Sequence, residues 1–186
     1  MPENTQNSAV ADSLKQLIED TLVNKCNAGL TQDTEVEERE IIEYDGRMRV
    51  GSLEKFNGPC YTVGFNLFGS ESDQKKGIAT GTLIFFVEEE SVERLLKSLE
   101  FRGFDEEDQG FVLEHLGQFF QSVSQDYAER MGGMGYGHLL VSNPTASKNN
   151  LPDGMTIPVN SSQYHELSFH LWKKKAMVID LVMAAQ

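Results

Sequence analysis

Residues 107–131 read EDQGFVLEHLGQFFQSVSQDYAERM, and the spacing of their apolar and polar side chains predicts one long amphipathic helix. Apolar side chains recur at three- and four-residue steps, as they do on one face of an α-helix: Val112, Leu116, Phe119, Phe120, Val123 and Tyr127. A polar row lies opposite and consists of Glu114, Gln118, Gln121 and Gln125. The row spans only about 60°, because each residue turns a helix by about 100°. We expect the apolar face to pack on a sheet and the polar row to point away from the core.

The flanking segments supply the other elements of this fold. Helical spacing of leucines predicts a helix over residues 14–22, and a second helix follows the strand-like GTLIFFV at residues 91–99. Strands are expected within residues 34–68, at 138–142, 155–159 and 165–172, and at 176–184, with 71–77, 143–154 and 172–175 as turns or loops. We therefore predict an α+β fold, a mainly antiparallel sheet with helices packed on one face. Residues 13–186 are expected to form a single domain after a flexible tail of residues 1–12.

Composition restricts the classes of partner. The chain has 186 residues, with 29 acidic against 16 basic side chains and a net charge of −13. Such a field repels phosphate backbones and anionic lipid, so no nucleic-acid partner is expected. No apolar run is long enough to span a bilayer, and the start has no features of a secretory signal. We expect a cytoplasmic protein without membrane insertion, in which Cys26 and Cys60 are reduced thiols.

Other candidate sites are weaker than the polar row. The glycines of GGMGYG, residues 132–137, follow a helix and precede a strand, which is the reverse of a dinucleotide-binding turn, so they predict a helix end. His165 and His170 lie five residues apart in a strand-like segment, which does not fit a zinc motif. Ser122 and Ser124 have no recognisable catalytic context. The polar row remains either a solvated helix face or a surface that uses its carboxamides.

A resemblance to a known family favours the second interpretation. In the CheC, CheX and FliY family of chemotaxis phosphatases, one helix carries an Asp or Ser, then a Glu four residues later, an Asn three residues after that, and a Pro after 22 further residues. Glu114, Gln118, Gln121 and Pro144 stand at these intervals. GTLIFFVEEESVERLLKSL, GYGHLLVSNPTASKNN and the closing YHELSFHLWKKKAMVIDLVMA resemble the family's flanking segments. The chain has one such motif helix and not two, and in this respect it resembles the CheX-like members of the family most.

The resemblance implies a partner and roles for the motif residues. Members of this family act on phosphorylated receiver domains of response regulators, where the Glu contacts an active-site lysine and the Asn orients the attacking water. Gln118 stands in the Glu place and Gln121 in the Asn place, with Pro144 as a supporting residue. The magnesium ion belongs to the receiver, so no cofactor of this chain's own is expected. A homodimer is implied in the same way.

The glutamines leave the catalytic assignment open. Gln121 is longer than Asn by a methylene group, and a displacement of about 1 Å can slow such chemistry roughly a hundredfold. A second register resembles CheZ, an unrelated helical phosphatase with an acid and a glutamine four residues apart: Glu114 would meet the lysine and Gln118 would hold the water. The chain is thus expected to be a CheX-like receiver-binding signalling protein with or without hydrolase activity. The alternatives are an inactive adaptor or dimerisation module, and a flagellar or pilus-associated structural partner.

Overall fold

The computed structural model describes residues 3–24, 29–44, 48–101 and 107–186, which form an α+β fold as predicted. A seven-stranded antiparallel sheet has the order β1-β8-β9-β5-β4-β6, with β7 also pairing with β4. Its strands are β1 (Glu35–Glu40), β4 (Cys60–Phe68), β5 (Gly81–Glu88), β6 (Leu140–Val141), β7 (Thr145–Lys148), β8 (Gln163–Leu171) and β9 (Lys174–Met183). A separate hairpin joins β2 (Ile42–Tyr44) to β3 (Met48–Val50). The helices are α1 (Glu3–Asn24), α2 (Glu71–Lys76), α3 (Glu89–Ser98) and α4 (Gln109–Met131), followed by the π-turn η1 (Gly132–Tyr136).

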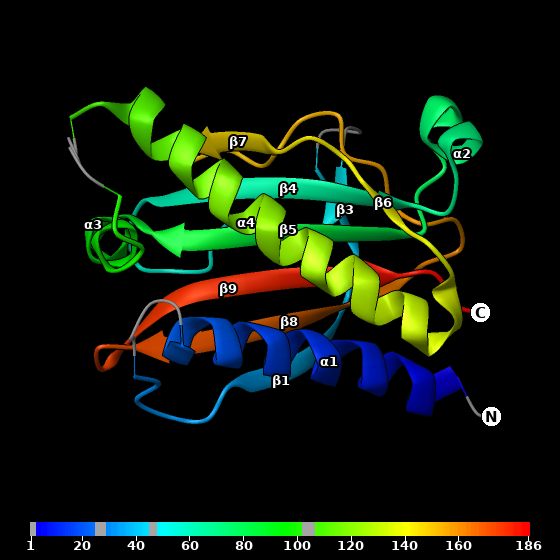
Figure 1. The fold of residues 1–186 in the computed structure, drawn as a ribbon, viewed down its shortest axis with the longest axis horizontal. Helices are drawn as coiled ribbons and strands as arrows, with labels where there is room; N and C mark the ends of the chain where they lie inside the picture. The colour runs from blue at the N-terminus through cyan, green and yellow to red at the C-terminus, as the bar shows by residue number, and fades with distance from the viewer. Residues whose placement is uncertain (1–2, 25–28, 45–47, 102–106) are drawn as a thin grey trace.

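Helices α1 and α4 lie side by side across one face of the sheet, called here the helix face (Figure 1). The ring of Phe120 stacks on that of Phe85 in β5, with 4.2 Å between ring centroids. The Tyr127 hydroxyl donates a hydrogen bond of 3.1 Å to the carbonyl of Val10, which ties α4 to α1. The apolar face of α4 is therefore anchored from its middle to its C-terminal part, and its other face is turned away from the sheet.

The opposite side of the sheet, called here the loop face, is covered by residues 51–59 and 149–158. Because side chains alternate along a strand, Phe85 points to the helix face while Ile84 and Phe86 point to the loop face. Leu53 and Ile157 from the two covering segments pack against this second cluster. The central strands β4, β5 and β9 are thus buried on both sides, although helices cover only one side of the sheet, as the sequence predicts.

A buried charge cluster, made of Lys55, Glu166 and Asp180 with the exposed Arg39 at its edge, lies where residues 51–59 cross the sheet. The Lys55 side chain is only 2% exposed; its ammonium donates to Asp180 Oδ1 at 2.8 Å and also to Glu166. Arg39 approaches the other oxygen of Glu166 at 3.1 Å. Burial raises the pKa of Asp180 to about 7, even though the nearby Lys55 lowers it. Burial lowers the pKa of Lys55, but the charges and hydrogen bonds of its two acidic partners outweigh burial and raise it.

The N-terminal helix begins earlier than the sequence analysis predicts. The expected flexible tail of residues 1–12 is largely helical, since α1 starts at Glu3. Val10 and Ala11 are buried, so the apolar face predicted to begin at Leu14 extends one turn further toward the N-terminus. Two small apolar residues among polar neighbours were too weak a periodic signal to reveal this turn of helix. The assignment of residues 13–186 to a single domain stays a prediction.

Three short segments were also wrongly assigned. Residues 71–76 form α2 instead of a turn: Ser70 caps its start by accepting from the Asp73 amide at 3.1 Å, and α2 has no buried face that periodicity could reveal. The loop expected at residues 143–154 contains strand β7, which pairs with β4. Residues 155–159 are not a strand, because the Asn66 carboxamide bonds both backbone groups of Thr156 in place of a strand partner. Of the two cysteines, Cys60 is a buried free thiol, and Cys26 lies outside the described residues.

Candidate functional site

Helix α4 presents the polar row to solvent. The helix starts at the Asp108 cap, whose carboxylate accepts from the Phe111 amide at 3.1 Å. Glu114, Gln118 and Gln125 are exposed, and Gln121 is half-buried. The row therefore faces away from the core, as predicted, and three of its four side chains are free to meet a partner.

Glu114 and Gln118 interact with each other. The Gln118 carboxamide donates a hydrogen bond of 3.3 Å to Glu114 Oε1, across one turn of the helix. Bonds of this kind between residues four apart are weak in water, so a partner can replace them. The contact brings a carboxylate and a carboxamide together on the exposed face of the helix.

Pro144 lies against the same part of α4. A Cβ atom added to Gly117 would come within 3.4 Å of Pro144 Cβ and Cγ, so the proline packs closely over this glycine. Gly117 immediately precedes Gln118 and is one turn before Gln121. The structure thus brings Pro144, 23 residues beyond Gln121 in sequence, next to the polar row.

His115 fixes the first turns of the helix. Its Nδ1 donates to the Phe111 carbonyl at 2.8 Å, and its ring stacks on Phe111 with 3.9 Å between centroids. Phe101 also contacts the imidazole, in an edge-on arrangement with 4.5 Å between ring centroids. These contacts are structural and orient the turn that carries Glu114.

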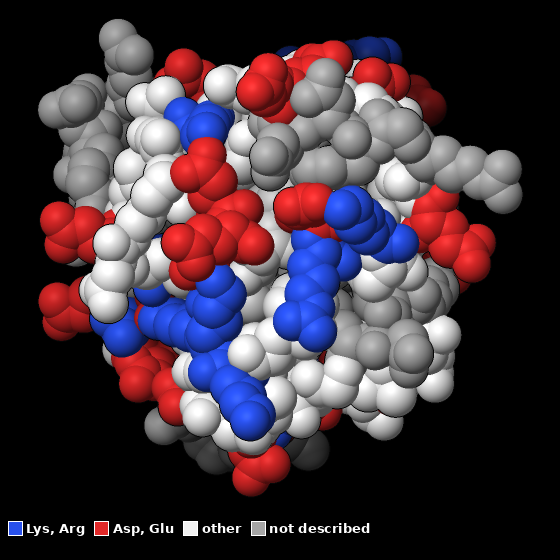
Figure 2. Space-filling view, turned by 90° about the vertical axis from the view of Figure 1, so that its left-hand side faces the viewer, with Lys and Arg blue, Asp and Glu red and all other residues white. Residues whose placement is uncertain are grey.

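Charged residues near the start of α3 are paired. Figure 2 shows Lys and Arg among Asp and Glu on this end of the molecule. Lys148 of β7 forms an ion pair with Glu89, and Lys174 approaches Glu88 at 2.8 Å and Glu90 at 3.0 Å. Partly exposed pairs of this kind contribute little to stability. These pairs join β7 and β9 to the start of α3.

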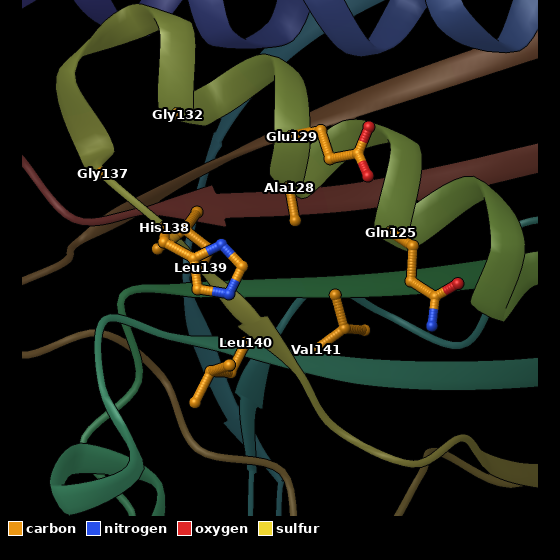
Figure 3. Close-up of a pocket in the computed structure, with 9 residues that line it drawn as sticks. All are labelled: Gln125, Ala128, Glu129, Gly132, Gly137, His138, Leu139, Leu140 and Val141. Carbon is orange, nitrogen blue, oxygen red and sulfur yellow. The ribbon is translucent and has the colours of Figure 1, made fainter.

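A groove lies beside the C-terminal part of α4 (Figure 3). It has a volume of about 520 Å³ and is bounded by α4 and residues 137–141. Gln125, Ala128 and Glu129 line one side, and His138 and Val141 line the other. The sequence analysis singled out Gln125 but not the groove, because the approach of residues 137–141 to α4 depends on tertiary structure.

No group of three or more His, Cys, Asp or Glu side chains in the described ranges is arranged to hold a metal ion. His165 lies on β8, where burial lowers its pKa. No described helix is both long enough and apolar enough to cross a bilayer.

Comparison with known proteins identifies the fold. No protein-family model and no curated protein sequence matches the chain. Among solved structures, a chemotaxis protein CheX from Desulfovibrio desulfuricans superimposes with a TM-score of 0.61 at 11% identity, covering 95% of this chain and 99% of that one. FliY from Thermotoga maritima gives 0.58 at 13% identity, covering 99% and 91%. CheX in a CheX–CheY–BeF₃–Mg²⁺ complex from Borrelia burgdorferi gives 0.54 at 15% identity, covering 95% and 96%.

These superpositions show that the chain has the fold of the CheC, CheX and FliY proteins, as the sequence resemblance implied. More particularly, it has a CheX-like chemotaxis-protein fold over nearly its whole length. At such low identity, superposition defines the fold alone.

Proposed function

We propose that this chain binds the phosphorylated receiver domain of a response regulator and accelerates hydrolysis of its aspartyl phosphate. The observation that carries the proposal is the exposed pair Glu114 and Gln118, one helical turn apart and joined by a hydrogen bond of 3.3 Å. A receiver is supported as the partner by the fold shared with the CheX of a CheX–CheY complex. A receiver partner also implies that the protein acts in the cytoplasm.

The two side chains suit different tasks. The Glu114 carboxylate can accept a charge-assisted hydrogen bond from the lysine of the receiver's active site. The Gln118 carboxamide both donates and accepts while staying neutral, so it can hold a water molecule in line with the phosphorus atom. Docking would separate Gln118 from Glu114, and the long, exposed bond between them makes that separation easy.

The reaction needs little from this chain beyond positioning. The water oxygen bonds to phosphorus while the bond from phosphorus to the receiver's aspartate oxygen breaks, and the water proton ends on the released inorganic phosphate. The receiver's own magnesium ion offsets the charge on the phosphoryl oxygens. No cofactor of this chain is required.

Gln121 is the alternative group for the water. It corresponds to the family's Asn, but it is half-buried and longer than Asn by one methylene group. The exposed Gln118 therefore has the freer access to a docked receiver. We assign the water to Gln118 and the lysine contact to Glu114, with Gln121 and Pro144 shaping the surface around them.

The proposal is tested by measuring phosphate release from the phosphorylated receivers of the source organism. We expect the wild type to accelerate release, and Gln118→Ala to remove roughly a hundredfold of that acceleration, the usual effect of lost positioning. Gln121→Ala should have a smaller effect. Ser122→Ala, exposed on the same helix but outside the polar row, is the matched control. Release at the spontaneous rate with every receiver would contradict the enzymatic proposal.

A second candidate is an adaptor that binds the receiver without hydrolysing its phosphate. It is favoured by the two glutamines that replace the Glu and Asn of the family motif. This candidate predicts phosphorylation-dependent binding with release at the spontaneous rate. A structural flagellar role would instead give binding that ignores phosphorylation. By analogy with CheX-like proteins, we also propose a homodimer, which sedimentation would test.

A further inference from the structure

The third glutamine of the polar row has no role in the proposed reaction. Gln125 lies one turn beyond Gln121 and is exposed. It also lines the groove between α4 and residues 137–141. In Figure 3 its side chain extends from α4 down to the level of Val141, and that of Ala128 lies farther along the helix. The polar row therefore continues into the groove, so a partner seated on Gln118 and Gln121 would also lie over it.

The lining of the groove combines an apolar floor with polar edges. Ala128 and Leu139 are only 4% and 5% exposed, and the half-buried Val141 lies beside them. Gln125, Glu129 and His138 are exposed at the edges. Glu129 is the one carboxylate among the lining residues, and it lies four residues, about one helical turn, after Gln125 on α4. The groove therefore combines apolar contact with a carboxylate and a carboxamide at its edge on α4.

This combination is complementary to a long basic side chain. Lys and Arg pack their aliphatic stems on apolar surface and keep the charged head near water. A stem against Ala128 and Val141 would place the head beside Glu129 and Gln125. The net charge of −13 adds to the attraction for a cation. A carboxylate or phosphate would instead meet the Glu129 charge.

We propose that the groove receives a lysine or arginine side chain from the receiver domain that docks on the polar row, and that Glu129 and Gln125 thereby help to select the receiver. The inference rests on the proposed function, since the same partner occupies both surfaces. It assigns the groove to affinity and partner choice, and leaves hydrolysis to Glu114 and Gln118. The two surfaces should therefore respond differently to mutation.

The test measures binding of the source organism's receivers, each held in its active form by beryllofluoride and Mg²⁺, to the full chain. Glu129→Lys reverses the charge at the edge of the groove. Asp153→Lys makes the same charge change at an exposed position in the segment that covers the loop face, and serves as the control. Thermal unfolding checks that both variants are folded.

We expect Glu129→Lys to weaken binding of the cognate receiver about tenfold and to reduce its salt dependence, since charges at the edge of an interface act mainly on association. Phosphate release at saturating receiver should not change. Asp153→Lys should bind like the wild type. Replacing the matching basic residue of the receiver with Glu should restore binding to Glu129→Lys.

Three results would overturn the inference, and they are distinguishable. If Glu129→Lys binds like the wild type, the groove is not a receiver contact, while the proposed function stands. If both lysine variants weaken binding equally, the effect comes from net charge and not from the groove. If the wild type binds no receiver of the organism, the proposed function fails and the inference fails with it.

Discussion

The polar row on α4 and the buried charge cluster on the loop face are the two sets of polar side chains that distinguish this molecule. Glu114, Gln118 and Gln125 are exposed, and the bond between Glu114 and Gln118 is long. Lys55 and Asp180 are almost completely buried and directly bonded to each other. Solvent can replace every contact of the first set, whereas a group removed from the second leaves an unbalanced charge inside the protein.

This difference in burial indicates that the polar row can serve function while the buried charge cluster serves folding. Exposed carboxamides can exchange a weak internal hydrogen bond for a bond to a partner at little loss of stability. The buried charge cluster joins β1, β8 and β9 to residues 51–59, so it fixes the segment that covers the loop face. We therefore assign the chemistry to α4 and a structural role to the cluster.

The largest effect is expected from Lys55→Met, which removes the central cation. Glu166 keeps Arg39 as a partner, but Asp180 loses its hydrogen-bond donor. Breaking a buried ion pair on one side commonly destabilises a protein by about 3–5 kcal/mol. Urea unfolding should show this loss, with part of it restored when Asp180→Asn is added. A variant as stable as the wild type would show that the cluster does not hold the covering segment.

The next effect is the pH dependence of stability that the buried Asp180 causes. Burial raises the pKa of Asp180 from 3.8 to about 7, so between these values the folded protein binds a proton that the unfolded chain releases. The contribution of Asp180 to stability is therefore largest below about pH 4 and is lost as the pH rises to about 7, by up to about 1.4 kcal/mol for each pH unit. Asp180→Asn removes this contribution. Unfolding free energies measured across the range should fall less steeply for the variant than for the wild type, and parallel curves would contradict the assignment.

An intermediate effect is expected at Gly117, where the polar row meets packed structure. A leucine there would push against Pro144, because even a Cβ atom comes within 3.4 Å of the proline ring. Overpacking of this kind typically destabilises by about 1–3 kcal/mol. Gly117→Leu should lower the melting temperature and also reduce receiver binding. Unchanged melting together with unchanged binding would mean that Pro144 is free to move and does not support the row.

The sequence predicted the elements that bury a periodic face. Helices α3 and α4 and the long strands β4, β5, β8 and β9 are recognisable from spacing alone, and the resemblance of the motif region led to the correct fold. Segments stabilised by particular contacts were not predicted. Helix α2 depends on its Ser70 cap, and residues 155–159 are held by the side chain of Asn66.

The buried charge cluster also depends on particular tertiary contacts and was not predicted from the sequence. Asp180 interrupts an apolar strand, which is a signal that a charged partner should exist, but nothing in the sequence points to Lys55, 125 residues away. The exposed row could be predicted because helical spacing is local. The groove could not be predicted from the sequence, because its second side is formed by residues 137–141, which lie next to α4 only in the folded chain.

The smallest change in stability is expected for the double variant Gln118→Ala with Gln121→Ala. Exposed substitutions usually alter stability by no more than about 0.5 kcal/mol, and alanine favours the helix slightly more than glutamine does. The half-buried Gln121 makes a small loss the expected direction. Chemical unfolding should therefore give nearly the wild-type curve, while any acceleration of phosphate release disappears. A loss as large as that of Lys55→Met would mean that the carboxamides are packing groups, and the contrast between the two polar sets would no longer hold.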